Sequence, residues 1–500
     1  MRQLFVNGQL ADLDEKTAIG INIQIGDFSE PCQNKLSSTN TFQLPKSSRN
    51  KRIFEFSDSA FVNSIMAYDK ITVDYYDGNV HLIKSAIGFL QNTSDSFQIS
   101  IIQGQSFINT IKSQPLNTWM GIEIIKLQLV GGTGFIGDIF YSDPSGYHQL
   151  MDDLMGTFAP TTPQIEFYKP IPAVVETGSN FCDAISIKSI FQWFTDYGIT
   201  STSPTPNFYQ INFLGTTAQI ADFEKLVLPC PFITKGEMVQ GSGEYGVYQP
   251  LDGLGNPRYI NYYGKKTVFD LFKSVCNIFN AYLDIDEKNN IVDIVTFNYI
   301  IEQNTVINWS NKIISGSKAT KYFFATGWNQ KNVINYKYDD GLNITLGQLT
   351  VESENRNIDL LKEVQNGLFI HRSKTNVNGD DIYYIGTSDI ELNPQFTQKG
   401  IEEISLYLIN GVTTGSYPVN RINSITGYSM LGNYSSMITV LKNPVRYEVD
   451  LNLNILDIYN FTQKNLVQID SLGGVFYVNK ISGFNRKSKS GTKTELLKIR

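Results

Sequence analysis

The two ends of this 500-residue chain carry the same order of sequence features, and this repeat constrains the fold more than any other feature. Residues 71–89 hold two β-rich runs around a tight-turn signal and end in Gly-Phe, and a polar loop and a further β-rich run at 97–102 follow. Residues 466–484 and 494–499 repeat this order. We therefore predict two similar β domains in one chain, separated by a long insertion. Because hairpins are common, a chance likeness between unrelated hairpins is the alternative.

The composition favours a mainly β fold. Charged residues make up only 18% of the chain, and neutral polar residues and tyrosine take their place beside β-branched neighbours. Such residues suit pleated sheets with one solvated face. Asn-Gly and Asp-Gly dipeptides, which tolerate the positive φ of tight turns, recur along the chain. They stand at Asn7-Gly8, Asp77-Gly78, Asp252-Gly253, Asp340-Gly341, Asn366-Gly367, Asn378-Gly379 and Asn410-Gly411.

Two segments show helical periodicity. In the first, residues 267–279 place apolar side chains at three-and-four spacing, with Thr267 as N-cap and Asp270 in the first turn. The second, residues 186–197, has one apolar face and Gly198 positioned to end it. Short apolar runs follow both, from Tyr282 and from Ile199, and predict strands. We interpret both segments as helices that cover sheets, so the predicted class is mainly β with minor α (α+β).

Charge and cysteine content exclude several function classes. The 41 basic and 48 acidic residues give a net charge of -7, without a basic tract, so we do not expect direct phosphate binding. The four cysteines lie too far apart for a paired zinc motif or a dense disulfide framework, and we interpret them as reduced. They are Cys32, Cys182, Cys230 and Cys276. The first residues lack the apolar core of a secretory signal, and no long apolar run predicts membrane insertion.

The opening of the chain resembles tail proteins of Bacteroidetes phages and prophages. Residues 4–28 and 38–54 carry this likeness, and so do 267–273 and 476–481. The resemblance covers about half of the chain and implies a baseplate hub, tail-tip hub or tail-associated protein. Such hubs are structural proteins, so the resemblance assigns no catalytic, cofactor-binding or metal site residue and no cofactor.

The resemblance implies a multidomain chain in which two tube-type β-barrel domains flank a mixed α/β middle region. We place a tube-type β domain at 1–115, an inserted β-rich or mixed domain at 116–260, a helix-plus-strand domain at 261–400 and a second tube-type domain at 401–500. Three copies would present six similar units in a ring, which matches a hexameric tube to a trimeric tip.

The implied role is to join the distal tail tube to the tip or spike and to continue the DNA channel. The implied partners are two further copies, the distal tail or tail tube protein, and spike, tip or fibre proteins, while DNA only passes through. We expect the chain to be assembled in the host cytoplasm and to end in the virion, without membrane insertion. Whether the tail contracts stays open.

One glycine-rich segment offers an enzymatic alternative, an NAD-dependent short-chain dehydrogenase or epimerase. Gly131, Gly134 and Gly137 have the spacing of a dinucleotide-binding turn. Tyr262 and Lys266 show that family's Tyr-x-x-x-Lys spacing, downstream of Ser242. However, the turn at 143–146 breaks the helix that should follow, and no second strand with an acidic end appears. We interpret the stretch as a loop and the protein as a non-enzyme.

Other polar and aromatic candidates carry weaker signals. His81, His148 and His371 lie in no metal or catalytic motif, and the acidic pairs Asp152-Asp153 and Glu402-Glu403 fit a solvated surface better than a glycosidase. Three aromatic clusters form the basis of the competing hypothesis, a glycan-binding receptor-recognition protein (adhesin). They are Tyr262-Tyr263, Tyr322-Phe323-Phe324 with Trp328, and Tyr383-Tyr384. The plainer interpretation is that these residues alternate between core and protein interface.

Overall fold

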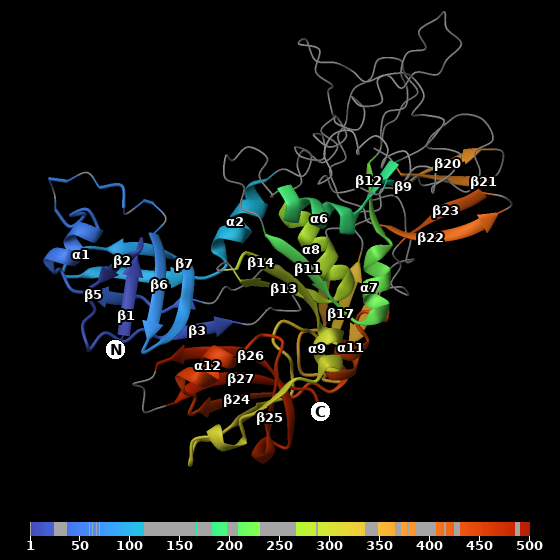
Figure 1. Ribbon diagram of the computed structural model, residues 1–500. Helices are drawn as coiled ribbons and strands as arrows, with labels where there is room; N and C mark the ends of the chain where they lie inside the picture. Colours follow the sequence, from blue (N-terminus) through green and yellow to red (C-terminus); the bar gives the residue numbers. More distant parts are fainter. Residues whose placement is uncertain are drawn as a thin grey trace, which may run out of the picture.

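The computed structural model describes the chain in separate stretches. These are residues 2–24, 38–59, 61–62, 64–66, 68–69, 71–114, 167–168, 183–197, 209–230, 267–286, 289–335, 349–365, 372–377, 380–385, 407–414, 417–424, 431–485 and 491–500. Within them the fold is mainly β with a minority of helices, which confirms the predicted class (Figure 1).

One 14-stranded sheet contains strands from both ends of the chain. Its main order is β16-β24-β27-β26-β3-β4-β8-β7-β6-β1-β2, while β5 pairs with β8 and β15 pairs with β25. The N-terminal strands are β1 (Arg2–Val6), β2 (Gln9–Ala11), β3 (Ile21–Gln24), β4 (Ser38–Thr39), β5 (Phe42–Leu44), β6 (Ile71–Asp77), β7 (Val80–Asn92) and β8 (Phe97–Ile102). The later strands are β15 (Val306–Asn308), β16 (Thr320–Tyr322), β24 (Arg446–Leu451), β25 (Leu466–Ile469), β26 (Gly474–Phe484) and β27 (Thr492–Lys498).

Tight turns form where two of the predicted dipeptides stand. Asn7 and Gly8 connect β1 to β2 with φ values of 48° and 74°, and Gly78 connects β6 to β7 with a φ of 66°. At Asn7-Gly8, positive φ at both central residues matches the right-handed twist of the flanking strands. In β6 the alternate side chains are buried, which places one face of the hairpin on the core.

The expected closed barrels do not form in the part of the chain that the structure describes. The 14-stranded sheet is an open path with β16 at one end and β2 at the other. The reason lies in β3, which pairs with β4 of the N-terminal region on one side and with β26 on the other. The two terminal regions are therefore halves of one sheet, whereas the family resemblance implied two separate barrels.

Both predicted helices are present in the middle region. Helix α8 (Val268–Phe279) begins after the N-cap Thr267, whose backbone N–H donates to the Asp270 carboxylate at 2.8 Å. Helix α6 (Ile187–Tyr197) matches the second prediction, while Gly198 and the run from Ile199 lie outside the described residues. The strand after α8 is β13 (Ala281–Asp286), as predicted.

A three-stranded sheet and surrounding helices form the core of the middle region (Figure 1). Strand β14 (Ile291–Thr296) lies between β13 and β11 (Gln210–Leu214), antiparallel to the first and parallel to the second. Phenylalanine rings fill the space between the helices; for example, Phe191 stacks on Phe272 with a centroid distance of 4.8 Å. Each fully buried Phe contributes about 1.5–3 kcal/mol of hydrophobic free energy. The other helices here are α2 (Gln105–Ser113), α7 (Thr217–Glu224), α9 (Phe297–Gln303) and α11 (Ser435–Lys442).

Three smaller sheets complete the described fold. The first has five strands, β9 (Phe167–Tyr168), β10 (Asp183–Ser186), β12 (Leu226–Cys230), β22 (Tyr407–Thr414) and β23 (Tyr417–Ser424). The second has three strands, β17 (Lys331–Asn335), β18 (Leu349–Glu352) and β19 (Leu361–Gln365). The third has two strands, β20 (Arg372–Val377) and β21 (Asp380–Ile385). The predicted turn at Asn410-Gly411 is wrong, because both residues pair with β23 inside the β22 ladder. β-Branched residues on both sides, such as Ile409 and Val412, outweigh the turn preference of the dipeptide. The dipeptides at 252–253, 340–341, 366–367 and 378–379 lie outside the described residues.

Candidate functional site: the junction of the two terminal units

The two halves of the large sheet share one topology. We call β1–β8 with helix α1 (Ser48–Ile53) the N-terminal unit, and β15, β16 and β24–β27 with helix α12 (Ile455–Asn460) the C-terminal unit. In each unit a strand, a helix and a three-stranded antiparallel meander follow one another, and the first strand pairs with the last. Thus β5-α1-β6-β7-β8 corresponds to β24-α12-β25-β26-β27. The order predicted from the sequence repeat is therefore present in both units.

The turn glycines of the two meanders also correspond. Gly78 and Gly473 occupy the same place in the aligned repeats, and their φ values are 66° and 67°. A side chain at positive φ is sterically disfavoured, so glycine is the residue that suits both turns. The turns differ in length, because the short helix η2 (Asp470–Leu472) precedes Gly473. The units are thus related in strand order but not in register.

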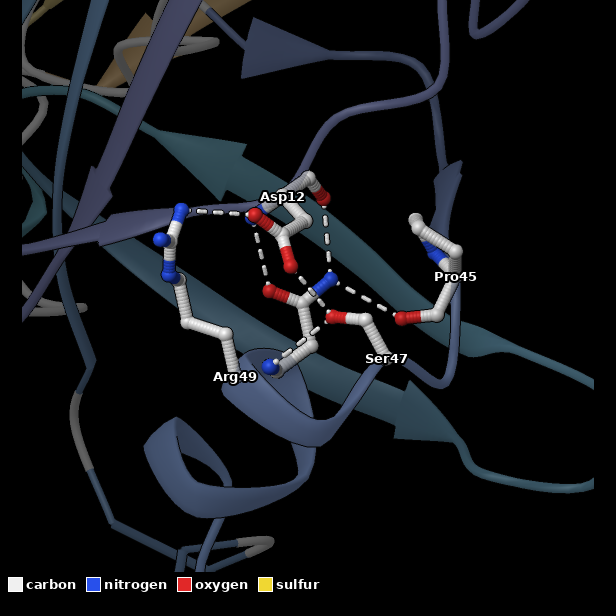
Figure 2. A network of polar contacts seen from close by, with 5 residues as sticks. Asp12, Pro45, Ser47 and Arg49 are labelled. Carbon is white, nitrogen blue, oxygen red and sulfur yellow. Dashed lines mark hydrogen bonds and ion pairs between the residues drawn. The ribbon is translucent and has the colours of Figure 1, made fainter.

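Polar contacts at its N-terminus fix helix α1 of the N-terminal unit (Figure 2). In α1, Asp12 accepts hydrogen bonds from Ser47 Oγ at 2.6 Å and Arg49 Nη1 at 2.7 Å. Asn50 is fully buried, and its Nδ2 donates to the backbone oxygens of Asp12 and Pro45, each at 2.8 Å. These contacts hold α1 against the segment that follows β2.

Helix α12 has a corresponding arrangement. Asn454 and Asp457 form a capping box, in which each side chain accepts a hydrogen bond from the backbone N–H of the other residue. Ser47 and Asn50 hold the same two positions in α1, where the Ser47 side chain accepts a hydrogen bond from the Asn50 N–H. Lys312 Nζ lies 2.7 Å from Asp457 Oδ2 and ties α12 to the short helix η1 (Ser310–Lys312), which follows β15. Each helix is therefore held by an ion pair to a segment that follows a strand of its own unit, β2 for α1 and β15 for α12.

Strand β3 joins the two units through backbone pairing. Ile23 lies opposite Ile481 and Ile21 lies opposite Phe484 of β26. The side chain of Asn22 accepts a hydrogen bond from the Gly483 N–H at 2.7 Å. Phe484 is buried at this junction, and the partner strand comes from residues more than 450 positions earlier.

A second contact between the units comes from α12, which packs on β7. Lys84 Nζ of β7 lies 5.8 Å from the ring centroid of Tyr459, within the range of a cation–π interaction. Nearby, His81 stacks on Tyr76 and pairs with Asp74 at 2.8 Å. Asp74 also accepts a hydrogen bond from the Ser85 N–H, so this group fixes the irregular β6–β7 hairpin.

Lys464 connects the C-terminal unit to the middle region. Asp284 and Asp293 lie directly opposite each other on β13 and β14, which is unfavourable for two negative charges. Lys464 Nζ lies 3.2 Å from Asp284 and forms a short ion pair with Asp293. Burial raises the pKa of Asp284, although Lys464 opposes this shift. Burial would lower the pKa of Lys464, but the two carboxylates outweigh it and raise that pKa.

Arg446 joins β16 to β24. Its guanidinium carbon lies 4.3 Å from the ring centroid of Tyr322 and 4.8 Å from that of Phe324. The Arg446 side chain is buried, and its nitrogens pair with Glu495 at 2.9 Å and Glu448 at 3.4 Å. Neither Arg446 nor Lys464 could be identified from the sequence, because the rings that cover Arg446 and both carboxylates beside Lys464 lie more than 100 positions away.

These contacts change the interpretation of the aromatic cluster at 322–328. Tyr322 and Phe324 contact Arg446, and Trp328 is buried. Only Phe323 in this group is largely exposed, and Lys321 Nζ lies 5.0 Å from its ring centroid. The cluster therefore stabilises the C-terminal unit and does not form the shared sugar-stacking surface of the adhesin hypothesis.

Most other sequence candidates lie outside the described residues. These are the glycine-rich stretch with Gly131, Gly134 and Gly137; Ser242, Tyr262, Tyr263 and Lys266; His148 and His371; Asp152, Asp153, Glu402 and Glu403; and Cys32 and Cys182. Tyr383 and Tyr384 fall on β21 and Cys230 falls on β12. Cys276 is a buried thiol in α8 and takes part in no disulfide.

Among the described residues, no group of three or more His, Cys, Asp or Glu side chains is placed to hold a metal ion. None of the described helices has the length and apolar character needed to cross a membrane.

Comparisons with known proteins give distant likenesses. No protein-family model and no curated protein matches the chain. Among solved structures, the 43 kDa tail protein of prophage MuSo2 from Shewanella oneidensis has a TM-score of 0.36 and 10% identity, over 100% of this chain and 97% of that one. A tail protein from Neisseria meningitidis has a TM-score of 0.37 and 8% identity, over 100% and 96%. Prophage tail protein gp18 from Listeria monocytogenes has a TM-score of 0.36 and 7% identity, over 99% of this chain and 94% of that one. TM-scores at this level do not establish a shared fold.

Proposed function

We propose that this chain is a structural subunit of a phage tail and forms the baseplate or tail-tip hub. The observation that carries the proposal is the common topology of the N-terminal and C-terminal units on one continuous sheet. A subunit with two related units allows three copies to present six similar surfaces. Such a ring matches a sixfold tube on one side and a threefold tip on the other.

In this proposal the protein acts through geometry and not through catalysis. The units continue the tube around a central channel, and the middle region braces them from outside the ring. The partners are two further copies of the chain, the distal tail or tail tube protein, and spike, tip or fibre proteins. Because the net charge is -7 and the sequence has no basic tract, DNA would pass through the channel with little attraction to its wall.

The polar groups of the junction fit a structural role. His81 forms a hydrogen bond with Asp74, and Lys464 pairs with Asp284 and Asp293, so these polar groups are engaged with each other. Arg446 is buried between aromatic rings and two glutamates. Groups paired in this way hold strands and helices in place.

The test is to locate the protein in phage particles purified from cells that encode it. We expect an antibody against the chain to label one end of the tail, at the tip or baseplate, in electron micrographs. Labelling of the capsid or along the tail tube would contradict the proposal, and so would particles that lack the chain.

A further inference from the structure

The segment after α1 exposes an unusual number of large apolar side chains. Phe61 and Tyr68 are 98% and 93% exposed, and Ile65 is 67% exposed. Phe56 and Val62 are also exposed. We call these five residues the apolar loop. Exposed apolar side chains that gather in one short segment are typical of a protein contact surface.

Internal contacts hold the apolar loop in a defined shape. Asp58 pairs with Lys46 at 3.3 Å and with Lys51 of α1 at 3.6 Å. The Phe56 N–H donates to the Lys51 carbonyl at 2.7 Å, which ends the helix. Phe56 itself has a φ of 55°, a conformation that bulky residues rarely adopt. The fold therefore holds a strained residue in place and leaves its aromatic ring exposed.

The C-terminal unit shows what contacts the equivalent helix. There, α12 packs on β7 of the N-terminal unit, with Lys84 above the Tyr459 ring. In Figure 1, α12 lies on the side of the C-terminal unit that faces the N-terminal unit, whereas α1 lies at the far side of the N-terminal unit, away from the C-terminal unit. Among the described residues, α12 thus packs on a neighbouring unit, whereas α1 lies on the side of the N-terminal unit that faces away from the C-terminal unit (Figure 1).

The loops after the two helices differ in a way that fits these positions. The connection from α12 to β25 is short, and its Phe461 is buried. The connection from α1 to β6 is longer and carries the apolar loop. The additional apolar surface therefore occurs in the unit whose helix faces away from the rest of the chain.

We infer that α1 and the apolar loop dock on β26 of the C-terminal unit of a second copy of this chain, as α12 docks on β7 within one copy. β26 is the strand that corresponds to β7 in the meander. The contact is head-to-tail, because α1 of one copy meets a different surface of the next. Head-to-tail contacts close into a ring when a whole number of copies completes a full turn. The inference rests on the proposed trimer and identifies the surface through which its copies would contact each other.

The first experiment removes apolar side chains that make few contacts within the chain. The variant Phe61→Ser with Tyr68→Ser should weaken self-association at least about tenfold, measured by sedimentation velocity over a range of concentrations. Its melting temperature should stay that of the wild type, since both side chains are almost fully exposed. The matched control is Leu360→Ser with Phe323→Ser, which removes exposed apolar side chains from another surface and should leave association unchanged.

The second experiment identifies the docking strand. Isotope-labelled and unlabelled chains are mixed, treated with a lysine-reactive cross-linker and analysed by mass spectrometry. We expect mixed-isotope cross-links between Lys51 of α1 and Lys480, which is exposed on β26. Cross-links that join only chains of the same isotope composition would place the contact within one copy and overturn the inference.

The outcomes separate this inference from the proposed function. One outcome is that the wild type forms a trimer, the Phe61→Ser, Tyr68→Ser variant forms it equally well, and no Lys51–Lys480 cross-link is found. This outcome would leave the proposed trimer in place and refute this contact surface. A wild-type chain that stays monomeric at every concentration, alone and in purified tail particles, would refute both. Loss of the trimer in the loop variant but not in the control would support the contact surface.

Discussion

Replacing Lys464 with Met should destabilise the fold, because the carboxylates of Asp284 and Asp293 would then face each other without the cation that pairs with both. Lys464 Nζ lies 3.2 Å from Asp284 and also pairs with Asp293, and the three side chains are 29%, 26% and 13% exposed. At an effective dielectric constant of about 20, a charge pair at this distance interacts by roughly 5 kcal/mol. The lost hydration of the charges offsets part of this gain, so we expect a net loss of about 2–3 kcal/mol in the free energy of unfolding.

The assay is urea denaturation at neutral pH, with Lys331→Met as the matched control. Lys331 Nζ lies 3.9 Å from Glu352, and the two side chains are 48% and 67% exposed, so the loss of Lys331 should cost at most about 1 kcal/mol. Asp284→Asn in the Lys464→Met background should recover part of the stability, because it removes one of the two like charges. If Lys464→Met costs no more than Lys331→Met, the reasoning about this cluster is wrong.

The same cluster predicts a pH dependence. The pKa of Asp284 is raised above 3.8 in the folded protein, and removal of Lys464 raises it further. A carboxyl group with a higher pKa in the folded state binds its proton more tightly there, so its protonation stabilises the fold as the pH falls. The deficit of Lys464→Met relative to wild type should therefore shrink as the pH is lowered from neutral toward that raised pKa. A deficit that stays constant over this range would contradict the assignment.

Three further predictions concern other parts of the described fold. Arg446→Met should cost about 2–4 kcal/mol of stability in thermal unfolding, because it removes the buried cation that pairs with Glu495, while Glu448 keeps its ion pair with Lys493 at 2.8 Å; a loss below that of a surface ion pair would contradict this. Gly491→Ala should cost more than the about 1 kcal/mol of Gly8→Ala, because both glycines have left-handed φ (+80° and +74°), but a Cβ at 491 would lie 2.1 Å from Ile314 Cδ1, which must move, and 3.3 Å from the Leu451 carbonyl oxygen, while Gly8 has open space; denaturant melts that rank the two in the opposite order would refute the comparison. Cys276 should resist alkylation in the native protein and react after unfolding, as followed by peptide mass spectrometry, because its thiol is buried.

Local patterns in the sequence predicted the local elements of the fold. The apolar spacing from Thr267 predicted α8 and its capping box, and the Asn7-Gly8 dipeptide predicted the β1–β2 turn. Both depend on neighbouring residues, so the information is present within a few positions. Asn410-Gly411 failed as a turn because its β-branched neighbours and its partner strand decided the structure there.

The long-range arrangement could be predicted only in part. The repeat at 71–89 and 466–484 predicted two related meanders, and both are present. The sequence did not reveal that β3 would join the units into one open sheet, because a four-residue strand carries no local signal for a partner more than 450 positions away. The clusters around Lys464 and Arg446 were missed for the same reason, since their residue types form a pattern only after folding.

The domain limits at 1–115, 116–260, 261–400 and 401–500 remain a proposal. In the described residues, β15 and β16 fall within the predicted 261–400 domain but pair with β25 and β24 of the C-terminal unit. We therefore propose that the C-terminal unit includes residues 306–322 and that the segment between β16 and β24 is inserted into it.

The most direct measurement is a reconstruction of the assembled hub by electron cryomicroscopy, from purified tails or from the trimer in solution. We predict three copies around a central channel, with N-terminal and C-terminal units alternating as six similar β units and with α1 of each copy against β26 of the next. Units stacked along the axis without a channel, or a ring in which only one unit of each chain takes part, would contradict the account.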